Sequence, residues 1–260
     1  MSMRFPLMLM TTAWLAVSAT GSASAEPPSR SISTGVVMAK RAVDIATKRQ
    51  ERITAIHVDR GDRVAADALL IETDADELLA DKAAAEAELG AAQVERDYRA
   101  RSADRLERLA RSESLAEDRL DEARYGLAAA EQRLRLAEAR LRKIDALLKD
   151  RRLTAPFAGI ITARTAELGQ LTRPGEPLLR LEDHSALELH TRVKERDVPR
   201  IGPGDPVRVT IDALDGMDLR ATVNHVIPSG DADHTFLVEI DLPRQDGLYP
   251  GMFGKAVFGE

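Results

Sequence analysis

Two different hydrophobic periods divide the chain into a central segment and two flanks. Across residues 75–151 proline is absent, glycine occurs only at Gly90 and Gly126, and alanine, leucine, glutamate and arginine predominate. This is the composition of long helices. From residue 120 onward, leucine recurs at every seventh position, with alanine or isoleucine three positions later. These positions are Leu120, Leu127, Leu134, Leu141 and Leu148, with Ala123, Ala130, Ala137 and Ile144. The heptad predicts a helix whose seam packs along a partner helix.

The partner helix is expected in the first half of the same segment. Its apolar face is less regular and contains a phase break; it is formed by Leu78, Ala85, Leu89, Val94, Tyr98, Leu106 and Leu109. Between the halves, Ser114 and Glu117 form the capping-box pattern that begins a new helix. We therefore predict an antiparallel coiled-coil hairpin over residues 75–151, with arms of about 35 residues that reach about 50 Å.

The flanks alternate apolar and polar residues with the period of two that half-buried strands show. The predicted strands include residues 53–58, 159–163, 187–193, 207–211 and 236–242. Turn signals separate the later ones, as in Gly202-Pro203-Gly204 and Pro228-Ser229-Gly230. The predicted fold class is α+β, mostly β, with the long hairpin and a small antiparallel β-barrel in the C-terminal third.

The N-terminus has the pattern of a secretory signal. Arg4 supplies a positive charge, an apolar stretch follows over residues 5–17, and Ala23-Ser24-Ala25 fits the small-residue cleavage pattern. The apolar stretch is shorter than the about 20 residues that a membrane-spanning helix needs. We predict a signal peptide over residues 1–25, cleaved after Ala25, and an exported protein.

Composition excludes several functional classes. The chain has no cysteine, which rules out disulfides, thiolate metal sites and a cysteine nucleophile. Its formal net charge of −6 argues against nucleic-acid binding, for which a basic surface is usual. Aromatic residues make up only 3% and charged residues 31%, which favours thin modules and solvated helices over one large core.

Candidate chemistry is sparse. The histidines are His57, His184, His190, His225 and His234, and no spacing among them is that of a zinc or copper site, although His184 and His190 could approach each other. The consecutive residues Asp183, His184 and Ser185 lack the separated placement of a catalytic triad. We predict a protein that is not an enzyme, with no catalytic, cofactor-binding or metal site.

The two segments that flank the hairpin look like halves of one module. RITAIHVDRGDRVAADALLIETD (52–74) and TAPFAGIITARTAELGQLTRPGEPLLRLED (154–183) each contain a strand, a turn at Gly61 or Gly169, and a second strand. Such halves resemble a split lipoyl or biotinyl domain. Together with the hairpin and barrel, they resemble the periplasmic adaptor family, also called membrane fusion or HlyD-like proteins. The terminal LYPGMFGKAVF (248–258) resembles that family's last barrel strand.

The resemblance implies a domain organisation. After the signal peptide, residues 26–40 and 184–260 would form the barrel domain, 41–74 and 152–183 the split lipoyl-like domain, and 75–151 the helical hairpin. Glu51 and Asp67 stand where the family often has glycine, so those turns are expected to differ in detail. The sequence stops at Glu260, and we expect the membrane-proximal domain that many members carry beyond the barrel to be absent or vestigial.

The resemblance also implies a function. The chain would be the periplasmic adaptor of a tripartite efflux system, linking an inner-membrane transporter, RND-type before ABC-type, to a TolC-like outer-membrane channel. Several copies would associate into a ring or funnel. The family motif at the hairpin tip, an arginine, a leucine and a serine, is matched by Arg105 and Leu109, whereas Ala116 replaces the serine. Pro250, Gly251 and Met252 are the candidates for pump contact.

Two alternatives come from other classes. The first is a lipoyl- or biotinyl-type carrier, because Asp81-Lys82-Ala83 resembles a modification triplet, although it lies in a helical run rather than at a turn between strands. The second is an envelope coiled-coil scaffold that works without a pump. Intact mass distinguishes the carrier, and the effect of gene deletion on sensitivity to exported compounds distinguishes the scaffold.

Overall fold

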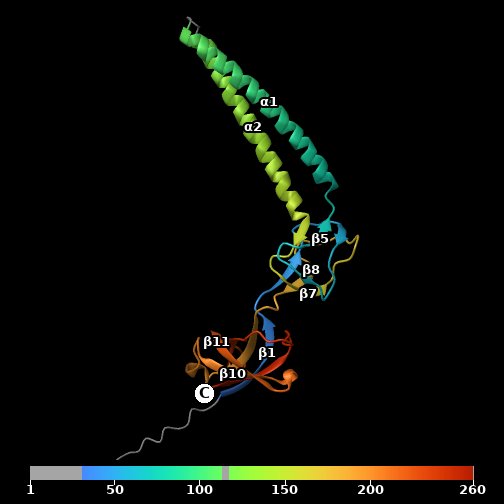
Figure 1. Ribbon diagram of the computed structural model, residues 1–260, viewed down its shortest axis with the longest axis vertical. Helices are drawn as coiled ribbons and strands as arrows, with labels where there is room; N and C mark the ends of the chain where they lie inside the picture. The colour runs from blue at the N-terminus through green and yellow to red at the C-terminus, as the bar shows by residue number, and fades with distance from the viewer. Residues whose placement is uncertain (1–30, 113–116, 260) are drawn as a thin grey trace, which may run out of the picture.

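The computed structural model describes residues 31–112 and 117–259. These form three bodies in a row: a pair of long helices, two small sheets, and a barrel at the opposite end from the helices (Figure 1). The predicted signal peptide, Ser114 and Ala116 lie outside the described ranges. Within those ranges, no helix combines the length and apolarity required to cross a membrane.

Six antiparallel strands close the barrel, as the alternation of the C-terminal third predicted. They are β1 (Ser31–Ala39), β9 (Leu187–Lys194), β10 (Pro206–Ile211), β11 (Met217–Gly230), β12 (Thr235–Asp241) and β13 (Phe253–Phe258), in the order β1-β13-β10-β11-β12-β9. Short 3₁₀ helices cover Val198–Arg200 and Asp212–Leu214. The inward positions of the strands, such as Leu189, Val209 and Ile240, are fully buried and form one apolar core.

Two small sheets form the middle body. Their strands are β2 (Ala42–Ala46), β3 (Ile53–Ile56), β4 (Arg63–Val64), β5 (Leu69–Thr73), β6 (Arg152–Thr154), β7 (Gly159–Arg164) and β8 (Pro177–Glu182), arranged as β2-β8-β7-β4 and β3-β5-β6. Each sheet contains strands from before and after the helices. Their shared core includes Leu70, Ile161 and Leu181, so neither segment has a complete core alone.

The glycine turns take the backbone conformation for which glycine is suited. Gly61 has φ +96° and Gly169 has φ +79°. Asp67, which stands where the resembling family often has glycine, also adopts the left-handed region at φ +60°. Aspartate enters this region more readily than most residues, so the backbone keeps the turn without the glycine.

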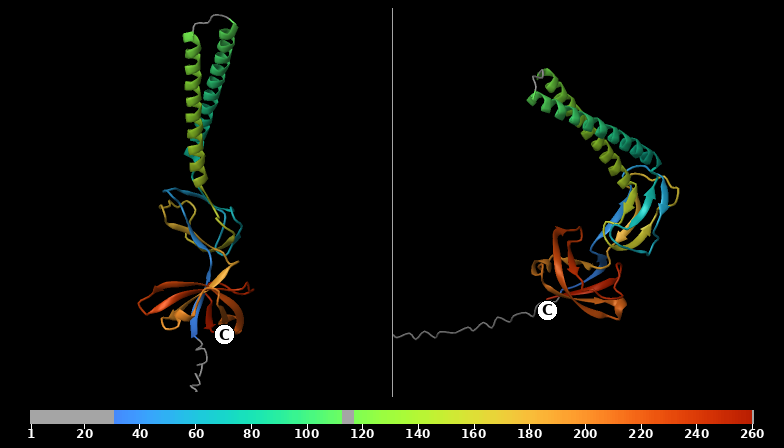
Figure 2. Two further views of the ribbon diagram at one scale, coloured as in Figure 1. Left: turned by 90° about the vertical axis from the view of Figure 1, so that its left-hand side faces the viewer. Right: turned by 45° about the horizontal axis from the view of Figure 1, so that its top comes forward.

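The helices α1 (Asp76–Ser112) and α2 (Glu117–Asp150) lie side by side and antiparallel (Figures 1 and 2). They contain 37 and 34 residues. At about 1.5 Å per residue they are about 55 and 50 Å long. The predicted seam of α2 faces inward: Ala130, Ala137 and Ile144 are buried, and the heptad leucines are half-buried.

The apolar face predicted for α1 is wrong in its middle. Val94 and Tyr98 are 69% and 57% exposed. After Leu89, the inward positions continue through Ala92 and Arg96, which are half-buried, to the buried Ala103. Positions that are alternately three and four residues apart stay on the face of α1 that packs against α2. Val94 and Tyr98 are not among these positions. The long apolar stem of an arginine can pack at an inward position of this kind. A search for apolar residues misses it, because arginine counts as a charged residue.

The chain crosses each junction between the bodies twice. It passes between barrel and sheets from β1 to β2 and again from β8 to β9, and between sheets and helices from β5 to α1 and from α2 to β6. At the barrel junction the two crossings are bonded together: the Asp183 amide donates to the Arg41 carbonyl at 2.9 Å, and Arg41 Nε donates to Asp183 Oδ2 at 3.0 Å.

Candidate docking surfaces

The end of the helical pair that lies farthest from the sheets carries two of the three predicted tip residues. Arg105 and Leu109 are four residues apart in α1, a spacing that places them on one helix face. Arg105 is exposed, and 39% of Leu109 is accessible. The third residue, Ala116, lies outside the described ranges. The described part of this end therefore offers a cation beside an accessible apolar side chain.

Large apolar residues are also exposed along the outer faces of both helices. The most accessible are Val94 and Tyr98 on α1 and Tyr125 and Leu136 on α2, with the last two 76% and 70% exposed. Val94 and Tyr98 are one helical turn apart and hence neighbours on one face. Sequence reasoning placed this pair in the seam and so missed it as a surface.

The predicted pump-contact turn is built against the first barrel strand. The Gly251 amide donates to the Val37 carbonyl, and the Val37 amide donates to the Met252 carbonyl, each at 2.8 Å. Gly251 has φ +90°, and Met252 packs against the barrel core. These contacts give Gly251 and Met252 a role in closing the barrel. The accessible groups are the neighbouring aromatic residues Tyr249 and Phe253, which are 54% and 66% exposed.

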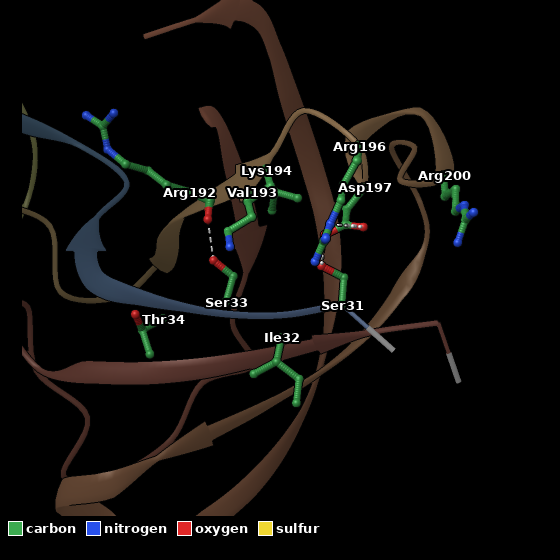
Figure 3. Close-up of a pocket in the computed structure, with 10 residues that line it drawn as sticks. All are labelled: Ser31, Ile32, Ser33, Thr34, Arg192, Val193, Lys194, Arg196, Asp197 and Arg200. Atoms are coloured by element: carbon green, nitrogen blue, oxygen red, sulfur yellow. Dashed lines mark hydrogen bonds and ion pairs between the residues drawn. The ribbon is translucent and has the colours of Figure 1, made fainter. Parts of the chain in front are cut away.

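A basic recess of about 620 Å³ lies between β1, β9 and the segment that follows β9 (Figure 3). Its lining combines hydroxyl groups from the start of β1 with four cationic side chains and one carboxylate. The residues are Ser31, Ile32, Ser33, Thr34, Arg192, Val193, Lys194, Arg196, Asp197 and Arg200. No local sequence pattern indicates this recess, because the fold brings residues 31–34 beside residues 192–200.

Contacts within the recess fix part of its lining. The Ser31 hydroxyl donates to Asp197 Oδ2 at 3.1 Å, and Arg196 lies 3.6 Å from the same carboxylate group. The Ser33 hydroxyl donates to the Arg192 carbonyl, and the Arg192 guanidinium pairs with Asp231 (Figure 3 draws the first contact). The lining remains cationic overall, so it suits a carboxylate or another anionic group.

Among the described histidines, the structure does not pair His184 with His190. His184 lies 3.6 Å from Glu182 at the end of β8, whereas His190 contacts Glu188 and Glu239 on the barrel. Glu188, His190 and Glu239 form a group whose possible metal-binding atoms all lie within 4.8 Å of one another. The spacing of the histidines in the sequence does not indicate this group, because strand pairing brings its members together.

Comparison with known proteins agrees with this architecture. Residues 189–260 match the family described as CusB-like, beta-barrel domain. The macrolide export protein MacA of Escherichia coli O157:H7 is 25% identical over 244 residues, which cover 84% of this chain. The chain spans only 64% of the length of MacA and 55% of that of an uncharacterized protein of Haemophilus influenzae, its curated relatives.

Solved structures share the fold. The membrane fusion protein Spr0693 of Streptococcus pneumoniae R6 aligns with a TM-score of 0.71 at 14% identity, covering 88% of this chain and 99% of that one. ZneB of Cupriavidus metallidurans aligns with a TM-score of 0.54 at 24% identity, covering 88% and 97%.

The helical pair, the interleaved sheets and the closed barrel give this chain the fold of a solved membrane fusion protein, and its sequence is similar to that of MacA, as the resemblance in the sequence predicted. The barrel carries the match to the CusB-like barrel domain.

Proposed function

We propose that this chain is the periplasmic adaptor subunit of a tripartite efflux system. It would link an inner-membrane transporter to a TolC-like outer-membrane channel and perform no chemistry of its own. After export and cleavage behind Ala25, the protein would work in the periplasm and be held at the inner membrane by its partners. The middle sheets would be a lipoyl-like domain split by a coiled-coil hairpin, with the boundaries predicted from the sequence.

The observation that carries this proposal is the separation of two contact surfaces on one chain. The helices extend about 50 Å from the sheets, on the side opposite the barrel (Figure 1). Arg105 and Leu109 lie at one end, and the basic recess lies on the barrel at the other. A protein with this arrangement can bind two partners at once, which is what an adaptor requires.

An RND-type transporter is the favoured inner-membrane partner. The support is the name of the matching family, Beta-barrel_RND_2, and it concerns residues 189–260. The relative MacA is named for macrolide export, which supports a role in efflux without identifying the cargo. Pro250, Gly251 and Met252 would hold the barrel in the shape that binds the transporter, while the cationic recess would take acidic side chains.

Self-association would complete the assembly. Copies placed side by side can cover the outer faces of the helices, where Val94, Tyr98, Tyr125 and Leu136 are exposed. Aromatic and aliphatic side chains in such numbers are costly to leave in water. A ring or funnel of adaptors would bury them and surround the transport path.

Site-directed crosslinking in living cells tests the adaptor role. The chain has no cysteine, so Leu109→Cys introduces a unique thiol to which a photo-crosslinker can be attached. Mass spectrometry then identifies what is captured. An outer-membrane channel is the expected product. Capture of other copies of the chain alone would support the pump-independent scaffold instead.

A covalent carrier function is the other alternative to the adaptor role. Lys82 lies within α1, where its ammonium group is 2.8 Å from Asp145 of α2. A swinging-arm lysine needs an exposed turn, so this placement disfavours modification. The intact mass of the exported protein decides the point, because a lipoyl or biotinyl group adds a defined mass increment.

A further inference from the structure

A row of ionisable side chains crosses three neighbouring strands on the outside of the barrel. Strand pairing sets His225 of β11 opposite Glu239 of β12, and Glu239 opposite His190 of β9. Glu188 lies two residues before His190 and hence on the same face of β9. Side chains opposite one another on adjacent strands are close enough to share a ligand.

A β-bulge in β11 shapes this row. The pairing between β11 and β12 shifts between Val223 and His225, which leaves Asn224 as the extra residue. Val223 is buried in the barrel, whereas Asn224 and His225 both reach side chains on the outer face. Without the bulge, alternation would turn residue 225 inward, so the bulge is what brings His225 to Glu239.

Each glutamate presents one oxygen to His190 and has its other oxygen held by a neighbour. Glu188 Oε2 and Glu239 Oε1 lie 3.3 and 4.0 Å from His190 Nε2. On the far side of Glu188, Oε1 accepts a hydrogen bond from Asn224 at 3.0 Å and lies 3.3 Å from the Lys40 ammonium. Glu239 Oε2 lies 3.3 Å from His225 Nδ1.

We propose that Glu188, His190 and Glu239 bind a divalent transition-metal ion, for which Zn²⁺ serves as the probe. An imidazole nitrogen with two carboxylate oxygens is a ligand set that zinc accepts, and water would complete the coordination. His225, Asn224 and Lys40 are positioning residues, because each holds the carboxylate oxygen that faces away from His190. Partners of this kind orient ligands and tune metal affinity.

The spacing fits a small ion after minor side-chain movement. Two ligands at about 2.0–2.1 Å from a tetrahedral zinc ion lie about 3.4 Å apart. The nitrogen and oxygen of His190 and Glu188 are already at 3.3 Å, and all three ligand atoms lie within 4.8 Å. Glu188 is nearly buried while Glu239 is partly accessible, so the Glu239 side chain has the freedom to close the set.

This site goes beyond the adaptor role and is tested on the purified chain alone, so its failure leaves that role unaffected. The exported protein is purified without a histidine tag, freed of metal with a chelator, and titrated with ZnCl₂ by calorimetry. One Zn²⁺ per chain is expected. Co²⁺ should bind with visible absorption bands that Zn²⁺ then abolishes.

Variants assign the residues. His190→Gln and Glu239→Gln should each lower zinc affinity at least about 100-fold, whereas His225→Gln should lower it about 10- to 100-fold and shift the Co²⁺ bands. His234→Gln is the matched control, because His234 is 83% exposed and lies outside the row. The zinc affinity of this variant should equal that of the wild type. Circular dichroism checks that each variant keeps its fold.

Two results would overturn the proposal. The first is a wild-type protein that takes up no Zn²⁺ at stoichiometric concentrations, which would make the row an ion-pair network only. The second is equal zinc binding by the wild type and a folded His190→Gln variant, which would place the metal elsewhere.

Discussion

Glu51 and Arg151 form an ion pair inside the junction between the sheets and the helices, where their side chains are only 3% and 19% exposed. The other carboxylate oxygen of Glu51 accepts a hydrogen bond from Thr73 Oγ1 at 2.6 Å. Thr73 precedes α1 and Arg151 follows α2, so one carboxylate contacts both chain segments that lead to the helices. A glycine at position 51 could make neither contact.

Removing this carboxylate should destabilise the sheets. Glu51→Ala leaves the Arg151 charge without its partner in a largely buried place, and we expect the free energy of unfolding to fall by about 3–5 kcal/mol. Urea unfolding followed by circular dichroism measures the loss. Lys48→Ala is the control, because Lys48 pairs with Asp150 at 2.6 Å nearby but is 75% exposed. That variant should lose at most about 1 kcal/mol. Equal losses would contradict a special role for Glu51.

Charging the far end of the helices should abolish transport. Leu109→Asp places a carboxylate on the proposed channel-binding surface at a position that is 39% exposed, so the chain should still fold and accumulate. The measurement is the sensitivity of a deletion strain, carrying each variant, to a compound that the intact system exports, with immunoblotting for protein level. Leu109→Met conserves volume and polarity and should restore full resistance. Full resistance with Leu109→Asp would exclude docking through this residue.

Acid should weaken the junction between the barrel and the sheets through Asp183. Burial acts to raise the pKa of Asp183, but hydrogen bonds from Ser185 and Arg41 outweigh it and keep the pKa below the ordinary 3.8. The folded pKa is thus lower than the unfolded one. The stabilisation is therefore complete above the unfolded value and is lost as pH falls through the folded value.

Urea unfolding at a series of pH values between about 5 and 3 tests this linkage. The wild type should lose stability over that range more steeply than Asp183→Asn, which has no proton to bind at this position. Asp183→Asn should also be less stable than the wild type at the upper end of this pH range, where Asp183 of the wild type is ionised. Parallel curves for the two proteins would show that Asp183 does not contribute to the acid response.

Restoring a glycine at position 67 should stabilise the sheets. Asp67 has φ +60° and an exposed side chain, so Asp67→Gly removes backbone strain of about 1–2 kcal/mol. The greater freedom of glycine in the unfolded chain offsets about 0.5–1 kcal/mol of this. A net gain of up to about 1.5 kcal/mol is expected in urea unfolding. Asp67→Val, with a branched side chain at the same position, should be destabilised, and a stable valine variant would refute the strain argument.

The sequence predicted those parts of the fold that depend on local periodicity. The α2 seam from Leu120 to Leu148 and the alternation of Val207, Val209 and Ile211 each lie within one element, so spacing alone places them. The middle of α1 was misplaced because hydrophobicity favoured Val94 over Ala92 and the stem of Arg96. A small residue and an amphipathic one carry little apolar signal although both fit a seam.

The candidate sites depended on contacts that no local pattern encodes. The recess needs β1 beside β9, and the metal-binding row needs the register of β9, β12 and β11 together with a one-residue bulge. A shift of one residue in any of these pairings would turn His190 or Glu239 to the other face. The residues that family motifs did indicate lie close together in the sequence: Arg105 and Leu109 within one helix, and Pro250, Gly251 and Met252 within one turn.

The double crossing at each junction has a mechanical consequence. A joint made of a single chain swivels freely, whereas two chain segments side by side oppose torsion and leave bending as the easier motion. The Arg41–Asp183 contacts fasten the two segments at the barrel joint. With helices about 50 Å long, a tilt of about 10° at the joint nearest them displaces their far end by about 9 Å. The chain can thus act as a lever, turning a small rotation at its base into a sideways stroke at Leu109.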